Sequence, residues 1–435
     1  MQRSRLLRLG LFQLAAGSTS VIFLGVINRV MRVELGIDLF VVSVLVGGGH
    51  YLGALVALPF GHYSDGHPLA GYRRSLYALL GALVTAVLLA ASPLVVVWLA
   101  GHQTPLGWVL GFLFFLLEGL STYLAGTAYL ALIADLTHEQ ERGPAAGVVW
   151  TMLMVGIIVT GIGAGSILDE YSFSAFLTLT VVGATLAVVL AGVALHGQER
   201  RLPAGAAAPR AQAGLGASLR LLWGSHAARW FGGFLVLAMF SFFMYDVLLE
   251  PFGGEVFGLN VAATTRFNSY LGAGVILAML LGGMVLIPRF GKTRITAIGC
   301  LLMAAGFGLL ALTGFANQPR LLSLAITVLG FGSGLFTVGG VSLMMDMTSA
   351  AHTGLFAGAW TLIQAVAKGP AAIVGGALQS LLVSNGATVA QAYAGVFVLE
   401  GLGVLLSLFF LSRVGVQAFR REVGSFGTLA APAMD

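Results

Sequence analysis

The sequence predicts an all-α membrane protein with twelve transmembrane helices, arranged as two pseudo-symmetric halves of six helices. Three observations lead to this prediction: of the 435 residues, 58% are hydrophobic, 61 are glycine and only 9% are charged. Soluble domains carry about 25% charged residues, so a soluble chain of this length would lack the polar surface needed to cover itself. The composition therefore excludes a soluble enzyme, and the long apolar blocks exclude a disordered or fibrous chain.

Individual spans follow from the interruptions between apolar blocks, because a bilayer is crossed by about 20 mostly apolar residues. Charges, prolines and polar clusters divide the chain into the predicted spans 11–33, 39–61, 75–99, 107–133, 144–168, 173–195, 229–250, 267–288, 295–315, 321–345, 354–380 and 390–412. With these spans, most of the 22 Lys and Arg residues lie on the side of the N-terminus. The positive-inside rule therefore predicts that both termini are cytoplasmic.

The longest interruption, 196–228, is rich in Ala, Gly, Pro and Arg and is predicted to be a cytoplasmic linker. It separates two six-helix bundles, 1–195 and 229–412, and a cytoplasmic tail follows at 413–435. A shift of 211 residues places Asp135 on Asp346. The same shift aligns the D-x-T-x5-G-x2-A-G pattern that begins at each of these residues. A parallel duplication of six-helix units is the architecture of major facilitator transporters.

A second sign of that fold is the loop between the second and third predicted spans. There Asp65, Arg73 and Arg74 resemble the major facilitator signature G-x3-D-R-x-G-R-R, although the Arg after Asp is missing and the turn is longer. An Asp at a helix end beside arginines suits a charge-and-dipole latch that holds one conformation. We assign Asp135 and Arg142, in the next cytoplasmic loop, to the same latch. The alternative is that these charges only set the topology.

Charges at the outer ends of the first and seventh spans predict a periplasmic gate. Arg29 and Glu34 end the first span, Asp246 and Glu250 end the seventh, and Glu255 follows. Asp246 and Glu250 are four residues apart and share a helix face, and the next residue, a proline, is expected to end that helix. We predict that Arg29 pairs with Asp246 or Glu250 across the cavity. The alternative is that these are interfacial charges that fix helix depth.

Ionisable residues within spans are functional candidates because burying a charge in a bilayer costs at least a few kcal/mol. Glu118, near the centre of the fourth span, is either a protonatable coupling site or a buried carboxyl hydrogen-bonded across helices. Lys368 and Glu400 lie near the centres of the last two spans, and we predict a mutual ion pair. No cluster has metal-ligand spacing, so no metal site is predicted, and no basic patch with interleaved aromatics indicates nucleic-acid binding.

Four stretches resemble one particular family. They are 9–13 leading to 28–35, the loop 64–74, the segment 134–152 with Ala134-Asp-Leu-Thr137 and Trp150-Thr-Met152, and the block 246–258. Together they are similar to the PucC and LhaA family, whose members are also named as a bacteriochlorophyll synthase chain. The resemblance implies a major facilitator fold in the bacterial inner, intracytoplasmic photosynthetic membrane. It also implies a role in assembling light-harvesting complexes, with antenna polypeptides, bacteriochlorophyll synthase and bacteriochlorophyll as candidate partners.

Given this resemblance, His50 at the midpoint of the second span is a candidate axial ligand for the magnesium of bacteriochlorophyll. The alternative is a histidine that donates to the carbonyl of a neighbouring helix. The sequence has no H-E-x-x-H and no Gly-x-Ser-x-Gly elbow, so we predict that the protein is not an enzyme.

Two function classes remain: an assembly factor that binds or delivers pigment, and a secondary transporter of a small or lipid-like molecule. Few polar residues lie near the middle of spans one, four, seven and ten, which favours the first class.

Overall fold

The computed structural model describes residues 3–55, 67–137, 142–199, 201, 226–346 and 353–414. The regular elements of these ranges are helices, and eleven of them are long and apolar enough to cross a membrane. A shorter apolar helix, Leu39–Leu55, occupies the place of the second predicted span, whose last residues lie outside the described ranges. The prediction of an all-α membrane protein is confirmed, with eleven of the twelve predicted spans at full length.

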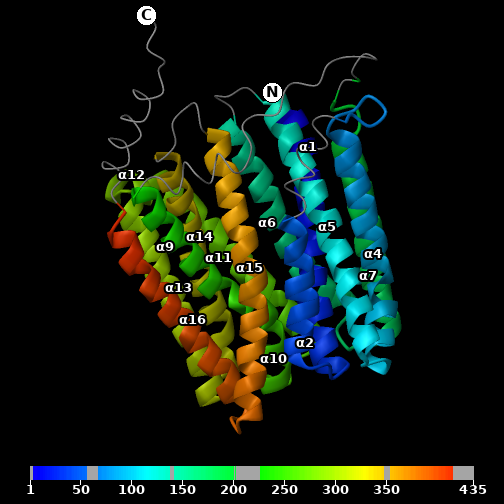
Figure 1. The fold of residues 1–435 in the computed structure, drawn as a ribbon, viewed down its shortest axis with the longest axis vertical. Coiled ribbons are helices and arrows are strands. Elements are labelled where there is room, and N and C mark those ends of the chain that lie inside the picture. Colours follow the sequence, from blue (N-terminus) through cyan, green and yellow to red (C-terminus); the bar gives the residue numbers. More distant parts are fainter. Residues whose placement is uncertain are drawn as a thin grey trace, which may run out of the picture.

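The helices form two bundles in chain order (Figure 1). The first contains α1 (Arg3–Ser20) with η1 (Val21–Ile27) and η2 (Val30–Glu34), α2 (Leu39–Val42) with η3 (Ser43–Gly49), α4 (Ser75–Gly101), α5 (Pro105–Leu136), α6 (Arg142–Ile167) and α7 (Phe173–Leu195). The second contains α9 (His226–Phe243) with η5 (Met244–Val247) and α10 (Leu249–Phe257), α11 (Val261–Leu281) with η6 (Gly282–Leu286) and α12 (Ile287–Phe290), α13 (Lys292–Ala316), η7 (Pro319–Leu321), α14 (Leu322–Asp346), α15 (Thr353–Ser384) and α16 (Val389–Ser412). The predicted linker, 196–228, lies mostly outside the described residues.

We call the end of the bundles at which α1 begins the inner end, which the charge distribution predicts to be cytoplasmic, and the opposite end the outer end. Several helices that begin at the outer end have a polar residue whose side chain accepts a hydrogen bond from the first turn. These caps are Asp38, Thr104, Ser172, Asn260 and Thr388. Each cap satisfies a backbone N–H that has no partner within the helix. The outer ends of these spans are therefore specified locally by the sequence.

The seventh predicted span extends further than its sequence suggests. The expectation that a proline ends this helix after Glu250 is wrong, because Pro251 lies in the first turn of α10, where its missing N–H is not needed. The chain instead tightens to a 3-10 turn at Met244–Val247 and resumes as a helix to Phe257. Asp246 is therefore placed deeper between the bundles than predicted.

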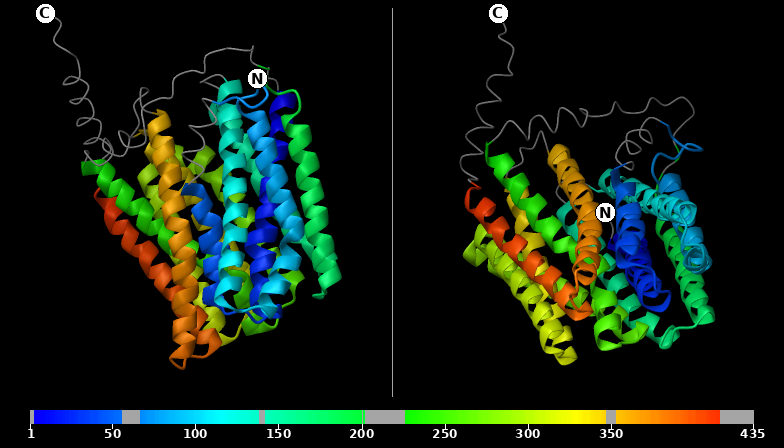
Figure 2. Two further views of the ribbon diagram at one scale, coloured as in Figure 1. Left: turned by 45° about the vertical axis from the view of Figure 1, so that its right-hand side comes forward. Right: turned by 60° about the horizontal axis from the view of Figure 1, so that its bottom comes forward.

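The two bundles meet along α6 with α11 and along α2 and η3 with α15. Small residues permit this approach: a Cβ on Gly161 would lie 2.3 Å from Ser269 Oγ, and a Cβ on Gly47 would lie 2.3 Å from the Cβ of Ala372. Figure 2 shows α15 running beside the first bundle. Small residues thus act as the packing surface that lets helices approach closely in membranes.

Within the first bundle, the second span crosses α5 almost at backbone contact. A Cβ on Gly53 would lie 2.3 Å from the carbonyl carbon of Gly119, and a Cβ on Gly119 would lie 2.1 Å from the carbonyl oxygen of His50. This crossing places the side chains next to it, His50 and Glu118, within reach of each other. The polar centre of the bundle therefore depends on two glycines.

Candidate functional site

The outer end of the structure is closed by charged side chains from both bundles. Arg32 Nη2, from the first bundle, lies 3.0 Å from Glu255 Oε1 on α10. The other carboxylate oxygen of Glu255 accepts a 2.5 Å hydrogen bond from the hydroxyl of Tyr393. Arg32 and Glu255 each lie two residues before the end of their helical segments, η2 and α10. This cluster of three residues, which we call the outer lock, joins the two bundles.

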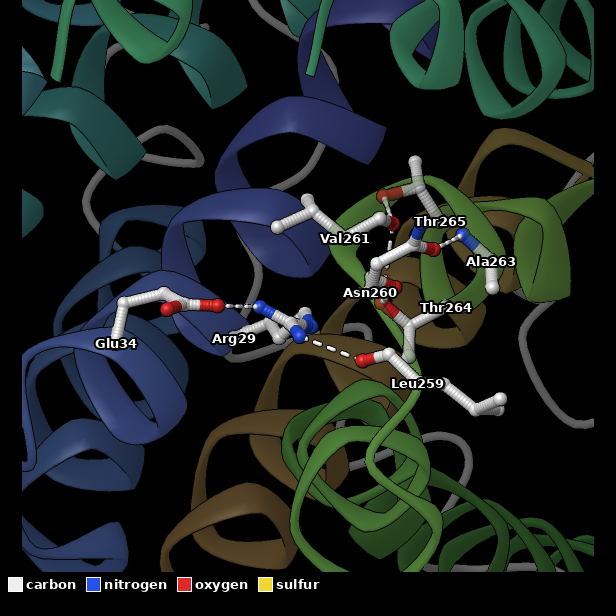
Figure 3. A network of polar contacts seen from close by, with 8 residues as sticks. All are labelled: Arg29, Glu34, Leu259, Asn260, Val261, Ala263, Thr264 and Thr265. Atoms are coloured by element: carbon white, nitrogen blue, oxygen red, sulfur yellow. Dashed lines mark hydrogen bonds and ion pairs between the residues drawn. The ribbon is translucent and has the colours of Figure 1, made fainter. Parts of the chain in front are cut away.

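Arg29 also reaches the second bundle, but not through the predicted partner. Its Nη1 lies 2.5 Å from Glu34 Oε1 on its own helix, and its Nη2 donates a 2.7 Å hydrogen bond to the carbonyl of Leu259 (Figure 3). The predicted direct ion pair of Arg29 with Asp246 or Glu250 is therefore not formed, although Arg29 still attracts Glu250 electrostatically. The helix is π-helical at Val30–Glu34, and i to i+5 geometry brings Arg29 and Glu34 to the same face.

Glu250 lies against the first bundle without a cation bonded to it. Its Oε1 accepts a 2.6 Å hydrogen bond from Asn268 Nδ2, and a Cβ on Gly25 would lie 2.0 Å from the same oxygen. The side chain is 4% exposed, so α10 packs Glu250 into the backbone of η1. Nearby, Asn28 donates a 3.1 Å hydrogen bond to the carbonyl of Val247, which adds a further link between the bundles.

The middle of the structure holds a buried histidine and carboxyl pair. His50 Nδ1 lies 2.5 Å from Glu118 Oε2, and Thr122 donates a 2.9 Å hydrogen bond to Glu118 Oε1. His50 and Glu118 are 6% and 1% exposed. The alternative that His50 donates to a helix carbonyl is wrong, because its Nδ1 faces this carboxyl. Glu118 is hydrogen-bonded across helices, and its role as a coupling site stays a prediction.

Aromatic rings and a second set of charges adjoin His50 on the side of the second bundle. The His50 ring lies 5.0 Å from the ring of Tyr51 and 5.4 Å from that of Tyr123. The hydroxyl of Tyr51 donates a hydrogen bond to Asp246 on η5. Lys368, on α15, attracts Asp246 electrostatically, and its Nζ lies 5.7 Å from the Tyr51 ring centroid. We call His50, Tyr51, Glu118, Tyr123, Asp246 and Lys368 the central cluster.

The central cluster combines buried and accessible groups. Tyr51 is 3% exposed, whereas Tyr123, Asp246 and Lys368 are each half-buried. These three come from α5, η5 and α15, and thus from both bundles. The cluster therefore brings together an acidic group, a basic group and aromatic rings where the two bundles meet.

The predicted ion pair between Lys368 and Glu400 is wrong. Lys368 lies over the Phe243 ring, with its Nζ 4.2 Å from the centroid, and faces Asp246. Glu400 on α16 is fully buried, and neither carboxyl oxygen has a hydrogen-bond partner among the described residues. The two helices are neighbours, but Lys368 points towards the first bundle and Glu400 into the second.

At the inner end, the structure describes only some of the residues of the predicted latch. Arg74 Nε lies 3.5 Å from Asp135 Oδ2, which brings two of the predicted residues together. Asp65 lies outside the described residues. Arg142 begins α6, but its side chain is outside the described part of the structure. A carboxylate that was not predicted, Glu199 after α7, also contacts the Arg73–Arg74 segment.

Glu199 caps the beginning of α4. Its oxygens accept hydrogen bonds from the backbone N–H groups of Arg73, Arg74 and Ser75 at 2.7 to 3.2 Å, and from the Ser75 hydroxyl at 2.7 Å. Partial burial acts to raise the pKa of Glu199, but these hydrogen bonds to the ionised form lower the pKa below its ordinary value. Glu199 is thus an ionised residue that stabilises a helix N-terminus.

Sequence reasoning missed several residues of these clusters. Arg32 is one of few basic residues on the predicted outer side, and that scarcity could have identified it. Tyr51 and Tyr123 give no signal in so apolar a chain. Glu199 lies in a basic segment, Glu199-Arg-Arg201, and an isolated acid there could have been considered as a partner for the arginine loop.

Comparison with known families gives one match over most of the chain. The family model described as PUCC protein matches residues 26–419. The "Bacteriochlorophyll synthase 44.5 kDa chain" of Rhodobacter capsulatus is 33% identical over 395 residues, which cover 87% of this chain and 88% of that protein. The "Protein PucC" of Cereibacter sphaeroides is 31% identical over 421 residues, which cover 93% of this chain and 90% of that protein.

Solved structures show the same fold at low sequence identity. A bacterial homologue of the human lysosomal transporter Spinster, in an inward-facing conformation, superposes with a TM-score of 0.74 at 14% identity, over 97% of this chain and 98% of that one. A D-xylose–proton symporter superposes with a TM-score of 0.66 at 17% identity, over 95% of this chain and 98% of that one. The chain is therefore a member of the PucC family and has the fold of the major facilitator transporters.

Proposed function

We propose that this protein is an integral membrane assembly factor for photosynthetic light-harvesting complexes, which holds bacteriochlorophyll between its bundles and passes it to antenna polypeptides. Membership of the PucC family supports the proposal, as does the name of the relative from Rhodobacter capsulatus. The proposed location is the bacterial inner, intracytoplasmic photosynthetic membrane, with both termini cytoplasmic. Bacteriochlorophyll synthase is a proposed partner that would supply the pigment, whereas this chain would carry out no catalysis itself.

The observation that carries the pigment proposal is the pair formed by His50 and Glu118. Histidines that bind a metal through one ring nitrogen usually donate the other N–H to a carboxylate or carbonyl, which fixes the tautomer and the ring orientation. Glu118 holds Nδ1 in this way, and no described residue is a hydrogen-bond partner of Nε2. Nε2 is thus the nitrogen suited to be an axial ligand for the magnesium of a chlorin.

The surroundings of His50 also suit a flat, mostly apolar pigment. Tyr51 and Tyr123 supply aromatic faces, and their rings lie 5.0 and 5.4 Å from the His50 ring. The half-buried Lys368 is a hydrogen-bond donor for the carbonyl groups on the pigment's edge. Gly47, Gly48 and Gly49 would not make the space for it, since each is packed against another helix.

A second function, secondary transport of a small or lipid-like molecule, is favoured by a different observation. In the sequence, spans one, four, seven and ten have few polar residues near their middle. In the structure, spans two and eleven contribute Tyr51 and Lys368, which meet Asp246 of span seven. An acid, a base and a hydroxyl at mid-membrane could bind a polar group or a proton.

Purification of the full chain in mild detergent from a phototrophic host tests the first function. We expect an absorption spectrum of bound bacteriochlorophyll and co-purification of antenna polypeptides. Colourless protein without antenna polypeptides would contradict the proposal and favour the transporter.

The ligand role of His50 is tested with His50→Leu, with His102→Leu as the matched control. His102 is exposed at the outer end and stacks on Trp98, away from the central cluster. We expect His50→Leu to lose pigment and Glu118→Gln to weaken pigment binding by about 10- to 100-fold, the usual effect of changing the partner of a ligating histidine. Unchanged pigment content and spectrum in His50→Leu would remove the ligand role.

A further inference from the structure

A second pocket lies away from the central cluster, at the inner end of the first bundle. It has a volume of about 660 Å³ and lies between α4 and α7, with Arg8 of α1 on its wall. This volume falls within the range of about 300–1,000 Å³ that is typical of small-molecule sites. The proposed pigment function does not use this pocket.

The lining of the pocket is amphipathic. Leu76, Leu79 and Val193 form an apolar wall, and Arg8 and His196 lie among the polar residues that line it. Val193 is 47% exposed on α7, a helix that crosses the membrane, so the apolar wall is open to the bilayer. The His196 backbone lies directly after the last residue of α7, at the level where lipid headgroups are expected.

The positive charge of Arg8, on the wall of the pocket, has no carboxylate partner among the described residues. Arg8 Nη2 donates a 2.8 Å hydrogen bond to the carbonyl of His196, while Arg8 Nε is buried without a partner. Arg5, one turn away, donates to the side chain and the carbonyl of Gln198 at 2.7 and 2.5 Å. Among the residues that the structure describes, no carboxylate forms an ion pair with Arg5 or Arg8. The guanidinium of Arg8 is thus held in place by a neutral carbonyl.

The acidic residue on this wall does not serve as the missing counter-ion. Glu199 uses both carboxylate oxygens to cap α4 through Ser75 and the two preceding backbone N–H groups. Its charge is therefore balanced by the N-terminus of α4. Arg201 adds a further positive charge nearby, where its Nε donates a 3.1 Å hydrogen bond to the carbonyl of Ala70.

We infer that this pocket binds the phosphate-bearing headgroup of an anionic lipid. The phosphate would pair with Arg8, and an acyl chain would lie along Leu79 and Val193. Basic pockets between transmembrane helices on the cytoplasmic side are suited to anionic headgroups, and arginine is suited to phosphate through its planar set of donors. A zwitterionic headgroup would bring a positive charge along with its phosphate and would leave the site with a net positive charge.

Native mass spectrometry of the full-length protein, purified in detergent and incubated with defined lipids, tests this inference. The probes are phosphatidylglycerol, phosphatidylcholine with matched acyl chains, and inorganic phosphate. We expect retention of phosphatidylglycerol over phosphatidylcholine, and a loss of about fivefold or more in phosphatidylglycerol affinity in Arg8→Gln, since one Arg near an anionic surface contributes about that factor. Arg294→Gln is the matched control, because Arg294 is exposed at the inner end of the other bundle.

A second variant tests whether the ligand of the pocket is a lipid or free phosphate. Val193→Trp fills the apolar side of the pocket without changing a charge, so it should reduce lipid binding. Equal retention of both lipids would overturn the inference, and so would unchanged phosphatidylglycerol binding in Arg8→Gln. Binding of inorganic phosphate that displaces phosphatidylglycerol would also overturn it. Arg8→Lys keeps the charge and should retain more lipid than Arg8→Gln, which would show that the loss is not due to misfolding.

Discussion

Reversing the charge of Arg32 should open the outer end. Arg32 and Glu255 form the ion pair of the outer lock, 3.0 Å apart, with side chains 17% and 18% exposed. Removing one partner of a hydrogen-bonded charge pair at an interface costs about 2–5 kcal/mol, and we take the lower limit because both side chains keep contact with solvent. About 2 kcal/mol corresponds to a change of about thirtyfold in the equilibrium between closed and open outer ends.

Cysteine labelling can measure this shift. The chain has one cysteine, Cys300, which is fully buried, so the wild-type background reacts little. Asn28→Cys places the reporter at a position that is 0% exposed between the bundles. We expect Arg32→Glu to raise the labelling rate of this reporter by about thirtyfold towards a membrane-impermeant maleimide. His102→Cys, on the exposed outer surface, should be labelled at the same rate in both backgrounds.

The double variant Arg32→Glu with Glu255→Arg should restore slow labelling, because it recreates the pair in the opposite orientation. Glu255→Arg alone should open the outer end further than Arg32→Glu, since it also removes the acceptor of the Tyr393 hydroxyl. Fast labelling in the double variant would refute the pairing. A reporter rate that does not change in either single variant would show that other contacts hold the outer end closed.

Two further predictions concern stability. Gly119→Ala should destabilise the protein by about 1–3 kcal/mol, because its Cβ would lie 2.1 Å from the His50 carbonyl oxygen. A Cβ at Gly126, on the same helix, would meet nothing within 4 Å, so Gly126→Ala should leave the thermal unfolding of the protein unchanged. The lowered pKa of Glu199 means that its ionised form stabilises the fold above about pH 4.5 and that this contribution is lost as the pH falls through the lowered pKa. The thermal stability of Glu199→Gln should therefore be below that of the wild type at neutral pH, and the gap should shrink in acid; a gap independent of pH would contradict the capping role.

The spans could be predicted from the sequence because the bilayer leaves few alternatives. Backbone groups must be paired within each crossing segment, so length and hydropathy are nearly sufficient to locate helices. The seventh span is different, because the sequence places Asp246 and Glu250 at the membrane surface. Hydropathy does not distinguish a charge that faces headgroups from one that faces protein, and both residues face the first bundle.

The contacts of the site depend on information that hydropathy lacks. Lys368 and Glu400 are at matching depths on neighbouring helices, but the rotation of each helix about its axis decides which side chains meet. The π-helical stretch at Val30–Glu34, which turns Arg29 towards Glu34, has no recognised sequence signal. Residue types and approximate depth could be predicted, whereas partners could not.

The order of contacts along the bundle axis connects the outer lock with the central cluster. Among the described residues, hydrogen bonds between the bundles extend from the outer lock inward as far as Tyr51 and Asp246. Between the central cluster and the inner end, no hydrogen bond or ion pair joins the bundles among the residues that the structure describes. In this conformation a ligand of His50 would arrive from the inner end. Under the proposed function, pigment would therefore be loaded from the cytoplasmic side, and release towards an antenna helix would require either lateral opening or rupture of the outer lock. The Arg32→Glu variant distinguishes these routes, because it should change the pigment content of the purified protein only if release passes through the outer end.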